Sequence, residues 1–323
     1  MKKKKIKNIL ISSFTDKKFP LFNKVLIAKK KIKSKKINVY VSNSQNSIYN
    51  VYFKNFFFQL PVCIDKNLTK ILHILRKNNI FFVIPTSDAE LLFWSKYKSF
   101  FLKNDIHVMI SSYYSILNCL DKLRFYNFCQ KKKIPVIQTF KKNNFKIYSY
   151  KKKFVIKERF GFIKNKVILN LERSKIKNFL PEFNNPIIQT HVSGKEISAD
   201  CYVSKYKKVI GIVIRERKLI IDGESKISTV INNKSLEKKI KNYINLLNLC
   251  GPVMIQGKIL NKKLYILECN TRIGGASTHS INYGLDLIYW ALLESLFPKP
   301  NLNFYTDKKK SLSQYRFPTD YYN

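Results

Sequence analysis

Three polar side chains alternate along one short segment late in the chain, and together they have the chemistry to hold a phosphate with a metal ion. The segment carries Glu268, Asn270 and Arg272 at every second position. In a strand, residues two apart point to the same face of the sheet, so Glu268, Asn270 and, if the strand continues that far, Arg272 would project together. A carboxylate beside an amide oxygen is a hard donor set that suits Mg²⁺. An arginine next to them can hold a phosphate through two hydrogen bonds.

The preceding segment supplies a further oxygen donor. Residues 253–260 and 263–269 are predicted to form a hairpin, and antiparallel pairing brings Gln256 close to Glu268. The four side chains together predict a site for a nucleoside triphosphate with its metal ions. The alternative for Glu268 is a strand-edge carboxylate paired with a surface lysine. That alternative does not explain why an amide, an arginine and two glycines follow it in series.

Residues further upstream could complete such a site. Lys157 ends a predicted buried strand, where a cation is costly unless it meets an anion, and a phosphate would serve. Glu196 follows a turn and could accept hydrogen bonds from ribose hydroxyls. Each has a plainer interpretation: Lys157 as a lysine whose stem is buried and whose head reaches water, and Glu196 as a turn carboxylate. Arg215 and Arg217 are either a solvated strand face or part of the site, and His279 either faces substrate or caps a helix.

The elements that must position these residues begin with an N-terminal region in which short apolar runs alternate with helical patterns. This alternation is typical of βαβ units with a parallel sheet, which place ligands at the carboxyl ends of their strands. Residues 85–90 stand at such an end and can cap the helix that follows. No G-x-G-x-x-G motif is present. The predicted strands are 7–14, 37–42, 80–85 and 106–110, and the predicted helices are 18–33, 65–78 and 88–103.

Beyond residue 114 the pattern changes to a helical, basic stretch at 115–132 and then to a run of β segments. The apolar residues of 115–132 lie mostly on one helical face, and those of 236–249 do so as well. A last helix is predicted near 278–296, and the tail from 298 is expected to be an edge or a loosely packed extension. Besides the hairpin, the predicted strands of this part are 154–157, 167–170, 187–192, 196–204, 208–216 and 226–231.

The chain of 323 residues is strongly basic, with 61 lysine and arginine residues against 20 acidic ones and a formal net charge of +41. Such an excess is the electrostatic footprint of a nucleic-acid-binding protein. However, only eight of the basic residues are arginine, the lysines are spread along the chain, and Lys, Asn, Ile, Phe and Tyr are all abundant. An AT-rich genome would produce this profile. We therefore expect most of the charge to be compositional, and nucleic acid is not the favoured partner.

Other classes are excluded by what the sequence lacks. No apolar run reaches the ~18 residues that a membrane helix needs. The six cysteines form no C-x-x-C pair and the four histidines form no H-E-x-x-H motif, so a zinc site is not expected. The cysteines are interpreted as reduced thiols of a cytoplasmic protein. With 45% hydrophobic residues the chain can bury a large core, which excludes a disordered protein.

Several segments resemble, in their order, the ATP-grasp superfamily. The resemblance is closest to the branch of the carbamoyl-phosphate-synthase large subunit, with a single ATP-grasp unit. It rests on Asp121-Lys122 with Ile134-Pro135, on 154–157, on Gln-x-x-Val-x-Gly-x-Glu-Ile-x-x-Asp at 189–200, and on Glu-x-Asn-x-Arg-x-Gly-Gly from Glu268. The resemblance implies an α/β and α+β protein. Its parts would be an N-terminal parallel-sheet α/β domain at 1–114, a two-lobed ATP-grasp domain at 115–297 (lobes 115–188 and 189–297) and a tail at 298–323.

The resemblance also implies roles for individual residues. Adenine would lie against the hinge at 190–192, ribose against Glu196, and the phosphates against lysines. Lys157 and Arg272 would be catalytic, because they would stabilise the transferred phosphoryl group. The implied nucleotide-binding residues are Lys122, Lys157, Gln189, Thr190, His191, Val192, Glu196, Gln256 and Glu268, and the implied metal ligands are Gln256, Glu268 and Asn270.

By the same resemblance the protein is an ATP-dependent ligase that uses ATP with Mg²⁺ or Mn²⁺. A carboxylate would be phosphorylated to an acyl phosphate, and an amine-type acceptor would displace the phosphate and form a C–N bond. No membrane is implied, and a homodimer is an assembly left open. The loop 159–166 keeps one glycine, Gly161, where family members carry several. An ATP-binding protein with weakened catalysis is therefore the alternative, and a basic nucleic-acid-binding protein a less favoured one.

Overall fold

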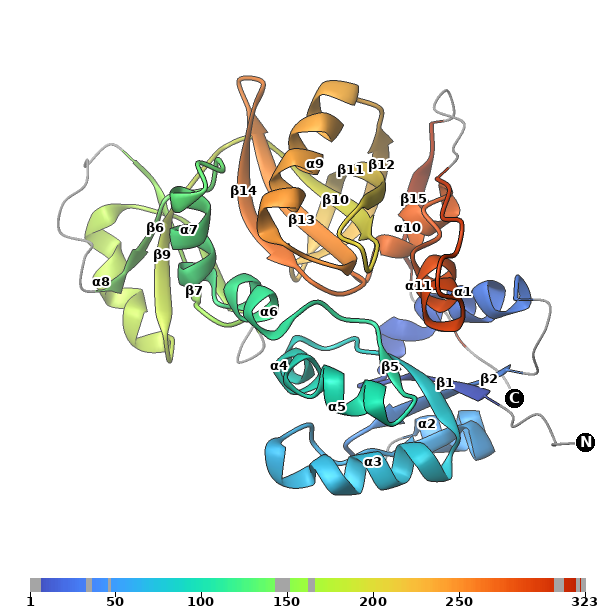
Figure 1. Cartoon of the computed structure of the whole chain (residues 1–323). Coiled ribbons are helices and arrows are strands. Elements are labelled where there is room, and N and C mark those ends of the chain that lie inside the picture. Colours follow the sequence, from blue (N-terminus) through green and yellow to red (C-terminus); the bar gives the residue numbers. More distant parts are fainter. Residues whose placement is uncertain are drawn as a thin grey trace, which may run out of the picture.

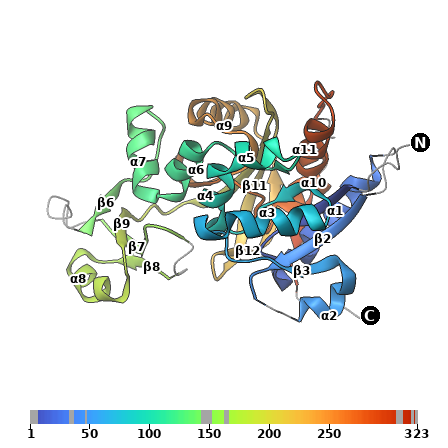
Figure 2. The same cartoon turned by 60° about the horizontal axis from the view of Figure 1, so that its bottom comes forward.

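The computed structural model describes residues 7–32, 37–45, 48–142, 152–161, 166–304, 311–317 and 320. Within these ranges the strands form three sheets, one parallel and two antiparallel (Figure 1). The mixed α/β fold with an N-terminal parallel sheet, predicted from the sequence, is confirmed. In Figures 1 and 2, helices α6 and α7 form the path of the chain from β5 of the N-terminal sheet to β6 of the four-stranded sheet.

The N-terminal sheet has the strand order β3-β2-β1-β4-β5 and carries helices on both faces. Ile9 and Ile11 of β1 pack toward α1 and α2, whereas Leu10 packs toward α3, α4 and α5. Strands buried on both faces need continuous apolar runs, which is the pattern of β1 and β4. The elements are β1 (Lys7–Ile11), α1 (Phe19–Lys30), β2 (Ile37–Asn43), α2 (Tyr49–Phe53), β3 (Phe57–Gln59), α3 (Leu68–Lys77), β4 (Ile80–Ile84), α4 (Asp88–Lys96), α5 (Lys98–Lys103) and β5 (His107–Val108).

A capping box begins helix α4 at the carboxyl end of β4. The Ser87 hydroxyl accepts a hydrogen bond from the Ala89 amide at 3.4 Å, and the Glu90 carboxylate accepts from the amides of Thr86 and Ser87 at 2.9 and 3.1 Å. These bonds satisfy amides that the first helical turn leaves without partners. The predicted cap is present, and it places Asp88 as the first helical residue.

The helical stretch predicted over 115–132 is formed by two helices, α6 (Tyr113–Leu120) and α7 (Lys122–Lys131), rather than by one. The break lies at Asp121, whose carboxylate accepts hydrogen bonds from the amides of Leu123 and Arg124 at 3.0 and 3.2 Å. Arg159 donates to the same carboxylate at 2.7 and 2.5 Å. Capping of α7 therefore outweighs the continuous apolar pattern, and it places Lys122 at the first position of α7.

The four-stranded antiparallel sheet has the order β6-β9-β7-β8. One face packs Phe154 and Ile156 of β7 against Ile176 and Leu180. The sequence missed β6, which has only three residues. Of the glycine-poor loop, residues 162–165 lie outside the described residues. The elements are β6 (Thr139–Lys141), β7 (Phe154–Glu158), β8 (Val167–Leu171), α8 (Ile176–Phe179) and β9 (Pro186–Thr190).

The six-stranded antiparallel sheet has the order β14-β13-β10-β11-β12-β15. Helix α9 covers one face, and α10 and α11 cover the other; α10 and α11 also pack against α1, which ties this sheet to the N-terminal one. The single helix predicted near 278–296 is split at Gly284, whose φ of +107° favours glycine. The elements are β10 (Lys195–Val203), β11 (Val209–Ile221), β12 (Glu224–Ile231), α9 (Lys234–Leu247), β13 (Gly251–Leu260), β14 (Lys263–Asn270), α10 (Ser277–Asn282), α11 (Leu287–Leu296) and β15 (Ser313–Tyr315).

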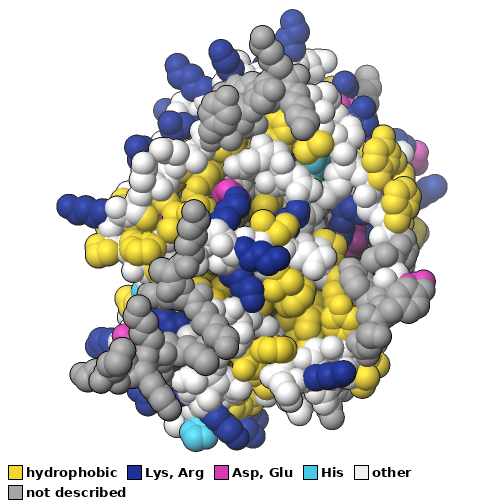
Figure 3. All heavy atoms as spheres, turned by 90° about the vertical axis from the view of Figure 1, so that its right-hand side faces the viewer, with side chains coloured by type: hydrophobic (Ala, Val, Ile, Leu, Met, Phe, Trp, Pro, Cys, Tyr) yellow, Lys and Arg dark blue, Asp and Glu magenta, His cyan; other side chains and the backbone are white. Residues whose placement is uncertain are grey.

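The basic side chains are spread over the surface in view (Figure 3), and the cysteines are unpaired, as the sequence predicts. Lysine and arginine side chains stand at many separate places on the face in Figure 3, along its rim as well as near its centre. All six cysteines are free thiols, and four of them are buried. In the described ranges no helix combines the length and the hydrophobicity that crossing a bilayer would take.

Candidate functional site

The hairpin predicted to hold the site is formed by β13 and β14. Gln256 stands directly opposite Glu268 in the register of the two strands, as predicted. The Asn270 amide nitrogen donates to Glu268 Oε1 at 3.1 Å, which places the two side chains together. The Asn270 carbonyl oxygen and Glu268 Oε2 are not used in that bond, so both can act as ligands. With the amide oxygen of Gln256, the hairpin offers three hard oxygen donors.

Two lysines from outside the hairpin act on Glu268. Lys157 at the end of β7 and Lys122 at the start of α7 together lower the pKa of the Glu268 carboxyl, against the burial that raises it. Burial lowers the pKa of Lys157 to about 8, although Glu268 opposes that shift. Lys157 is 9% exposed, and among the described residues none forms a hydrogen bond or an ion pair with its ammonium group. A buried cation of this kind favours an anionic ligand.

Arg272 is held by a residue that the sequence did not place in the site. Its Nε and Nη2 donate to the two carboxylate oxygens of Asp88 at 2.6 and 2.9 Å. Asp88 begins α4 and lies 184 positions away in the chain. The predicted phosphate-binding arginine is therefore paired across the boundary between the N-terminal sheet and the hairpin. A signal was available, since Asp88 follows the carboxyl end of a parallel strand.

The two arginines of β11 are buried, so the solvated strand face considered for them is wrong. Arg217 pairs with Glu196 and donates to the Gly223 carbonyl at 2.6 Å. Arg215 is fully buried and donates to Asp200 Oδ2 at 2.9 Å. One carboxylate oxygen of Glu196 is thus engaged by Arg217. The assignment of Glu196 to ribose remains a prediction that has to accommodate this partner.

The hinge segment joins the two antiparallel sheets. The Gln189 side chain is buried and donates to Thr139 Oγ1 at 2.8 Å, so it holds β6 against β9. The amide of Thr190 donates to the Gln138 carbonyl at 3.1 Å, and that of His191 to the Lys153 carbonyl at 2.8 Å. Burial and Lys258 lower the pKa of the His191 imidazole. Of the predicted hinge, the Val192 amide is the one for which the described residues provide no hydrogen-bond partner.

A buried polar network fixes the turn that follows Arg272. The Gly274 amide donates to Ser277 Oγ at 2.9 Å, and Ser277 Oγ donates to Asp200 Oδ1 at 2.5 Å. A Cβ at Gly274 would lie 2.8 Å from Met254 Sδ, so the turn packs closely on β13. The pair of Asp200 and Arg215 therefore connects the interior of the large sheet to the backbone beside the candidate site.

His279 belongs to this interior and does not cap a helix. Its Nδ1 lies 2.8 Å from Ser228 Oγ, and its Nε2 lies 3.1 Å from the Leu312 carbonyl oxygen. The side chain is buried, and burial lowers the pKa of His279 to about 4, with the Arg215 charge contributing.

A histidine with a lowered pKa makes the fold sensitive to acid. In the unfolded chain the His279 imidazole takes up a proton near pH 6.5, whereas in the folded chain it stays neutral down to about pH 4. The contribution of His279 is therefore complete above pH 6.5 and falls by up to about 3 kcal/mol as the pH drops to about 4. We expect His279→Gln to flatten the decline in the free energy of unfolding over this window, as measured by urea denaturation. An unchanged decline would refute the assignment.

The donor set fits a magnesium ion that also binds phosphate. Among the described residues no group of three or more His, Cys, Asp or Glu side chains could hold a metal ion. The hairpin instead provides one carboxylate and two amide oxygens. Mg²⁺ keeps several water ligands and is commonly held by one or two carboxylates together with substrate phosphates. These residues therefore fit a nucleotide-bound Mg²⁺ better than a metal ion held by protein alone.

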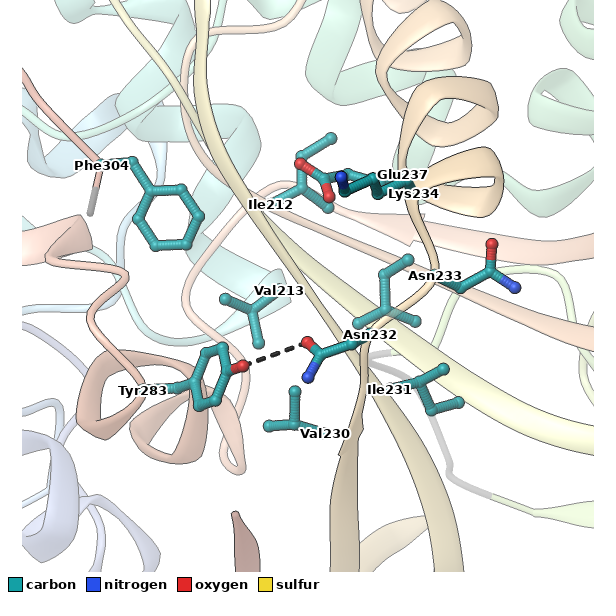
Figure 4. Close-up of a pocket in the computed structure, with 11 residues that line it drawn as sticks. Ile212, Val213, Val230, Ile231, Asn232, Asn233, Lys234, Glu237, Tyr283 and Phe304 are labelled. Carbon is teal, nitrogen blue, oxygen red and sulfur yellow. Dashed lines mark hydrogen bonds between the residues drawn. The ribbon is translucent and has the colours of Figure 1, made fainter. Parts of the chain in front are cut away.

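A cavity of about 240 Å³ lies elsewhere, where β11 runs past the end of β12 (Figure 4). Its walls are mainly apolar side chains of these two strands, with Tyr283 and Phe304. The Tyr283 hydroxyl donates to Asn232 Oδ1 at 3.0 Å within it. None of the predicted site residues lines this cavity.

Comparison with known proteins was made for the sequence and for the structure. Residues 182–311 match the family described as "ATP-grasp in the biosynthetic pathway with Ter operon". This range includes the hairpin with Gln256, Glu268, Asn270 and Arg272. No curated protein sequence matches the chain at a significant level.

Solved structures with the same fold cover nearly the whole chain. The biotin carboxylase of Campylobacter jejuni has a TM-score of 0.68 at 14% identity, and the match covers 92% of this chain and 73% of the carboxylase chain. The N5-carboxyaminoimidazole synthetase of Staphylococcus aureus has a TM-score of 0.66 at 16% identity, covering 90% and 77%. The L-amino acid ligase of Bacillus licheniformis has a TM-score of 0.66 at 15% identity, covering 91% and 75%. Residues 182–311 therefore resemble an ATP-grasp family, and the described chain has the same fold as these three structures.

Proposed function

We propose that the protein is an ATP-dependent ligase that joins a carboxylate to an amine at a site between its two antiparallel sheets. The observation that carries this proposal is the arrangement of Lys122 and Lys157 opposite Glu268. The charges of Lys157 in β7 and Lys122 in α7 both act on the Glu268 carboxylate, which belongs to a hairpin with three oxygen donors. Cations on one side and metal ligands on the other are what a nucleoside triphosphate with Mg²⁺ requires.

In this proposal ATP binds with its adenine at the hinge (190–192) and its phosphates toward the turn at Gly274. The adenine lies at the hinge, where the Val192 amide is available as a donor. Lys122 and Lys157 hold the phosphates, and a phosphate beside Lys157 raises the pKa that burial has lowered, because it stabilises the charged ammonium group. Gln256, Glu268 and Asn270 hold Mg²⁺, which neutralises phosphate charge when bound. Glu196 is assigned to the ribose through the oxygen that Arg217 does not use.

The reaction has two steps. First, a carboxylate oxygen of the substrate attacks the γ-phosphorus of ATP, and the bond to the bridging oxygen breaks, so that an acyl phosphate and ADP form. Second, an amine nitrogen attacks the acyl carbon, phosphate leaves, and the nitrogen loses a proton. Arg272 and Lys157 stabilise charge on the transferred group. No side-chain nucleophile takes part.

The division of the chain follows from this assignment. We propose an N-terminal domain at 1–114, ATP-grasp lobes at 115–188 and 189–297, and a tail at 298–323. The carbamoyl-phosphate-synthase-like branch is part of the proposal and is supported by the Glu-x-Asn-x-Arg-x-Gly-Gly string.

A screen of ADP and phosphate release tests the proposal. Purified protein with ATP and Mg²⁺ is incubated with pairs drawn from a panel of carboxylic acids and amines. We expect ADP and phosphate to accumulate in equal amounts when a productive pair is present, and less when either partner is left out. Binding of Mg-ATP without release across the panel would favour the ATP-binding protein with weakened catalysis.

A further inference from the structure

Asp88 and Arg272 form an ion pair between two parts of the chain that have separate cores. Asp88 begins α4 in the N-terminal region, and Arg272 follows β14 in the larger antiparallel sheet. Both side chains are 18% exposed, and the two hydrogen bonds of 2.6 and 2.9 Å use both carboxylate oxygens. A bidentate contact of this kind fixes the plane of the guanidinium group as well as its position.

The contact occupies one edge of the guanidinium group and leaves the other available. Asp88 binds Nε and Nη2, whereas Nη1 makes only a long contact of 3.4 Å to the Ile273 carbonyl oxygen. Arginine carries five N–H donors in a rigid fork, so the edge between Nη1 and Nη2 can bind a second anion while Asp88 stays in place. Arg272 follows the candidate metal ligand Asn270 by two residues, which keeps the guanidinium group close to that site. Burial lowers the pKa of Arg272, but Asp88 and, to a smaller extent, Glu268 raise it above its usual range.

A second cation explains why a carboxylate is needed at this point. Lys18 donates to the Thr86 carbonyl oxygen at 3.2 Å. Burial and the charge of Arg272 lower the pKa of the Lys18 ammonium to about 8, while Asp88 opposes the shift. Without Asp88, two like charges would repel each other beside the glycine turn, and the Arg272 side chain would lose its fixed orientation.

We propose that Asp88 is a positioning residue, which holds Arg272 so that its free edge faces the phosphoryl group during transfer. The proposal rests on the function proposed above. It adds a residue of the N-terminal region to a site otherwise built from the two antiparallel sheets. Asp88 also lies outside residues 182–311, the range that matches the ATP-grasp family.

The test separates nucleotide binding from stabilisation of the transferred group. Dissociation constants are measured for Mg-ADP alone and for Mg-ADP with aluminium fluoride, which imitates a phosphoryl group in transfer. In Asp88→Asn the shape is kept and the charge is lost. We expect the dissociation constant for Mg-ADP to change by less than about twofold, as for a site not in contact with ADP. The aluminium fluoride complex should weaken by about tenfold or more, the effect of one misplaced charge-assisted bond pair.

Two further variants complete the design. Asp65→Asn breaks an exposed ion pair between Asp65, which precedes α3, and Lys96 at the end of α4. Mg-ADP and its aluminium fluoride complex should then bind as in the wild type. Asp88→Glu keeps the charge but moves it, so its dissociation constant for the aluminium fluoride complex should lie between those of the wild type and Asp88→Asn. It also serves if Asp88→Asn does not fold.

The outcomes distinguish the two claims. Equal binding of the aluminium fluoride complex by the wild type and both Asp88 variants would overturn the positioning role and leave the proposed function intact. An equal weakening of Mg-ADP and of the aluminium fluoride complex would also overturn it, because that pattern indicates general damage to the site. Absence of Mg-ADP binding in the wild type would overturn the proposed function, and the positioning role with it.

Discussion

Glu268→Gln is expected to reduce ATP turnover by about a hundredfold or more. Glu268 is the one carboxylate of the proposed metal ligands, and a catalytic metal ion stabilises charge in the transition state by several kcal/mol. Each 1.36 kcal/mol corresponds to about tenfold in rate. The glutamine keeps the size of the side chain and its hydrogen bond to Asn270, so the fold should persist. ADP release is measured across a range of Mg²⁺ concentrations.

The control for this prediction is Glu216→Gln. Glu216 lies on β11 of the same sheet, and its carboxylate is 3.9 Å from the Lys195 ammonium, a weak and partly exposed pair. Its loss should leave turnover and the Mg²⁺ requirement unchanged. Turnover that survives in Glu268→Gln at the wild-type rate would mean that the metal site is assigned to the wrong residues.

Arg215→Met is expected to lower the free energy of unfolding by about 3–5 kcal/mol, the cost of leaving one partner of a buried ion pair alone. Arg215 is fully buried and Asp200 is 1% exposed, so water cannot replace the lost contact. Asp200 also accepts from Ser277 and Ser280 at 2.5 Å, which extends the damage to the turn at Gly274. Urea denaturation followed by circular dichroism measures the effect.

Two comparisons make that prediction specific. Lys96→Met removes an exposed pair with Asp65, and such pairs contribute only about 0.2–1 kcal/mol. The double variant Arg215→Met with Asp200→Leu removes both buried charges and should recover part of the lost stability, because an apolar pair can replace a buried ion pair. A cost for Arg215→Met as small as that for Lys96→Met would contradict the buried network.

The features that the sequence predicted are those with local causes. The period of two along 268–272 predicted that Glu268 and Asn270 share a face, and the short turn predicted the register that sets Gln256 opposite Glu268. The alternation of apolar strands and helices predicted the N-terminal parallel sheet. In each case the relevant neighbours are a few residues away or follow a regular pattern.

The features that the sequence did not predict depend on contacts between distant residues. Nothing in the pattern at 115–132 reveals that Arg159 comes to Asp121 and ends the helix there. The pairing of Arg272 with Asp88 depends on how the N-terminal sheet docks against the hairpin. The sequence did not predict whether Arg217 lies on the surface or in the site, because a strand pattern does not show which carboxylate lies on the neighbouring strand.

The central claim is that ATP binds with Mg²⁺ between the lysines and the hairpin. Isothermal titration calorimetry of ATP into the full chain, with and without Mg²⁺, tests it most directly. The account predicts one site per chain whose affinity depends on Mg²⁺ and is lost in Lys157→Met and in Glu268→Gln, but not in Glu216→Gln. Absence of binding by the wild type, or equal binding by Lys157→Met and Glu268→Gln, would contradict it.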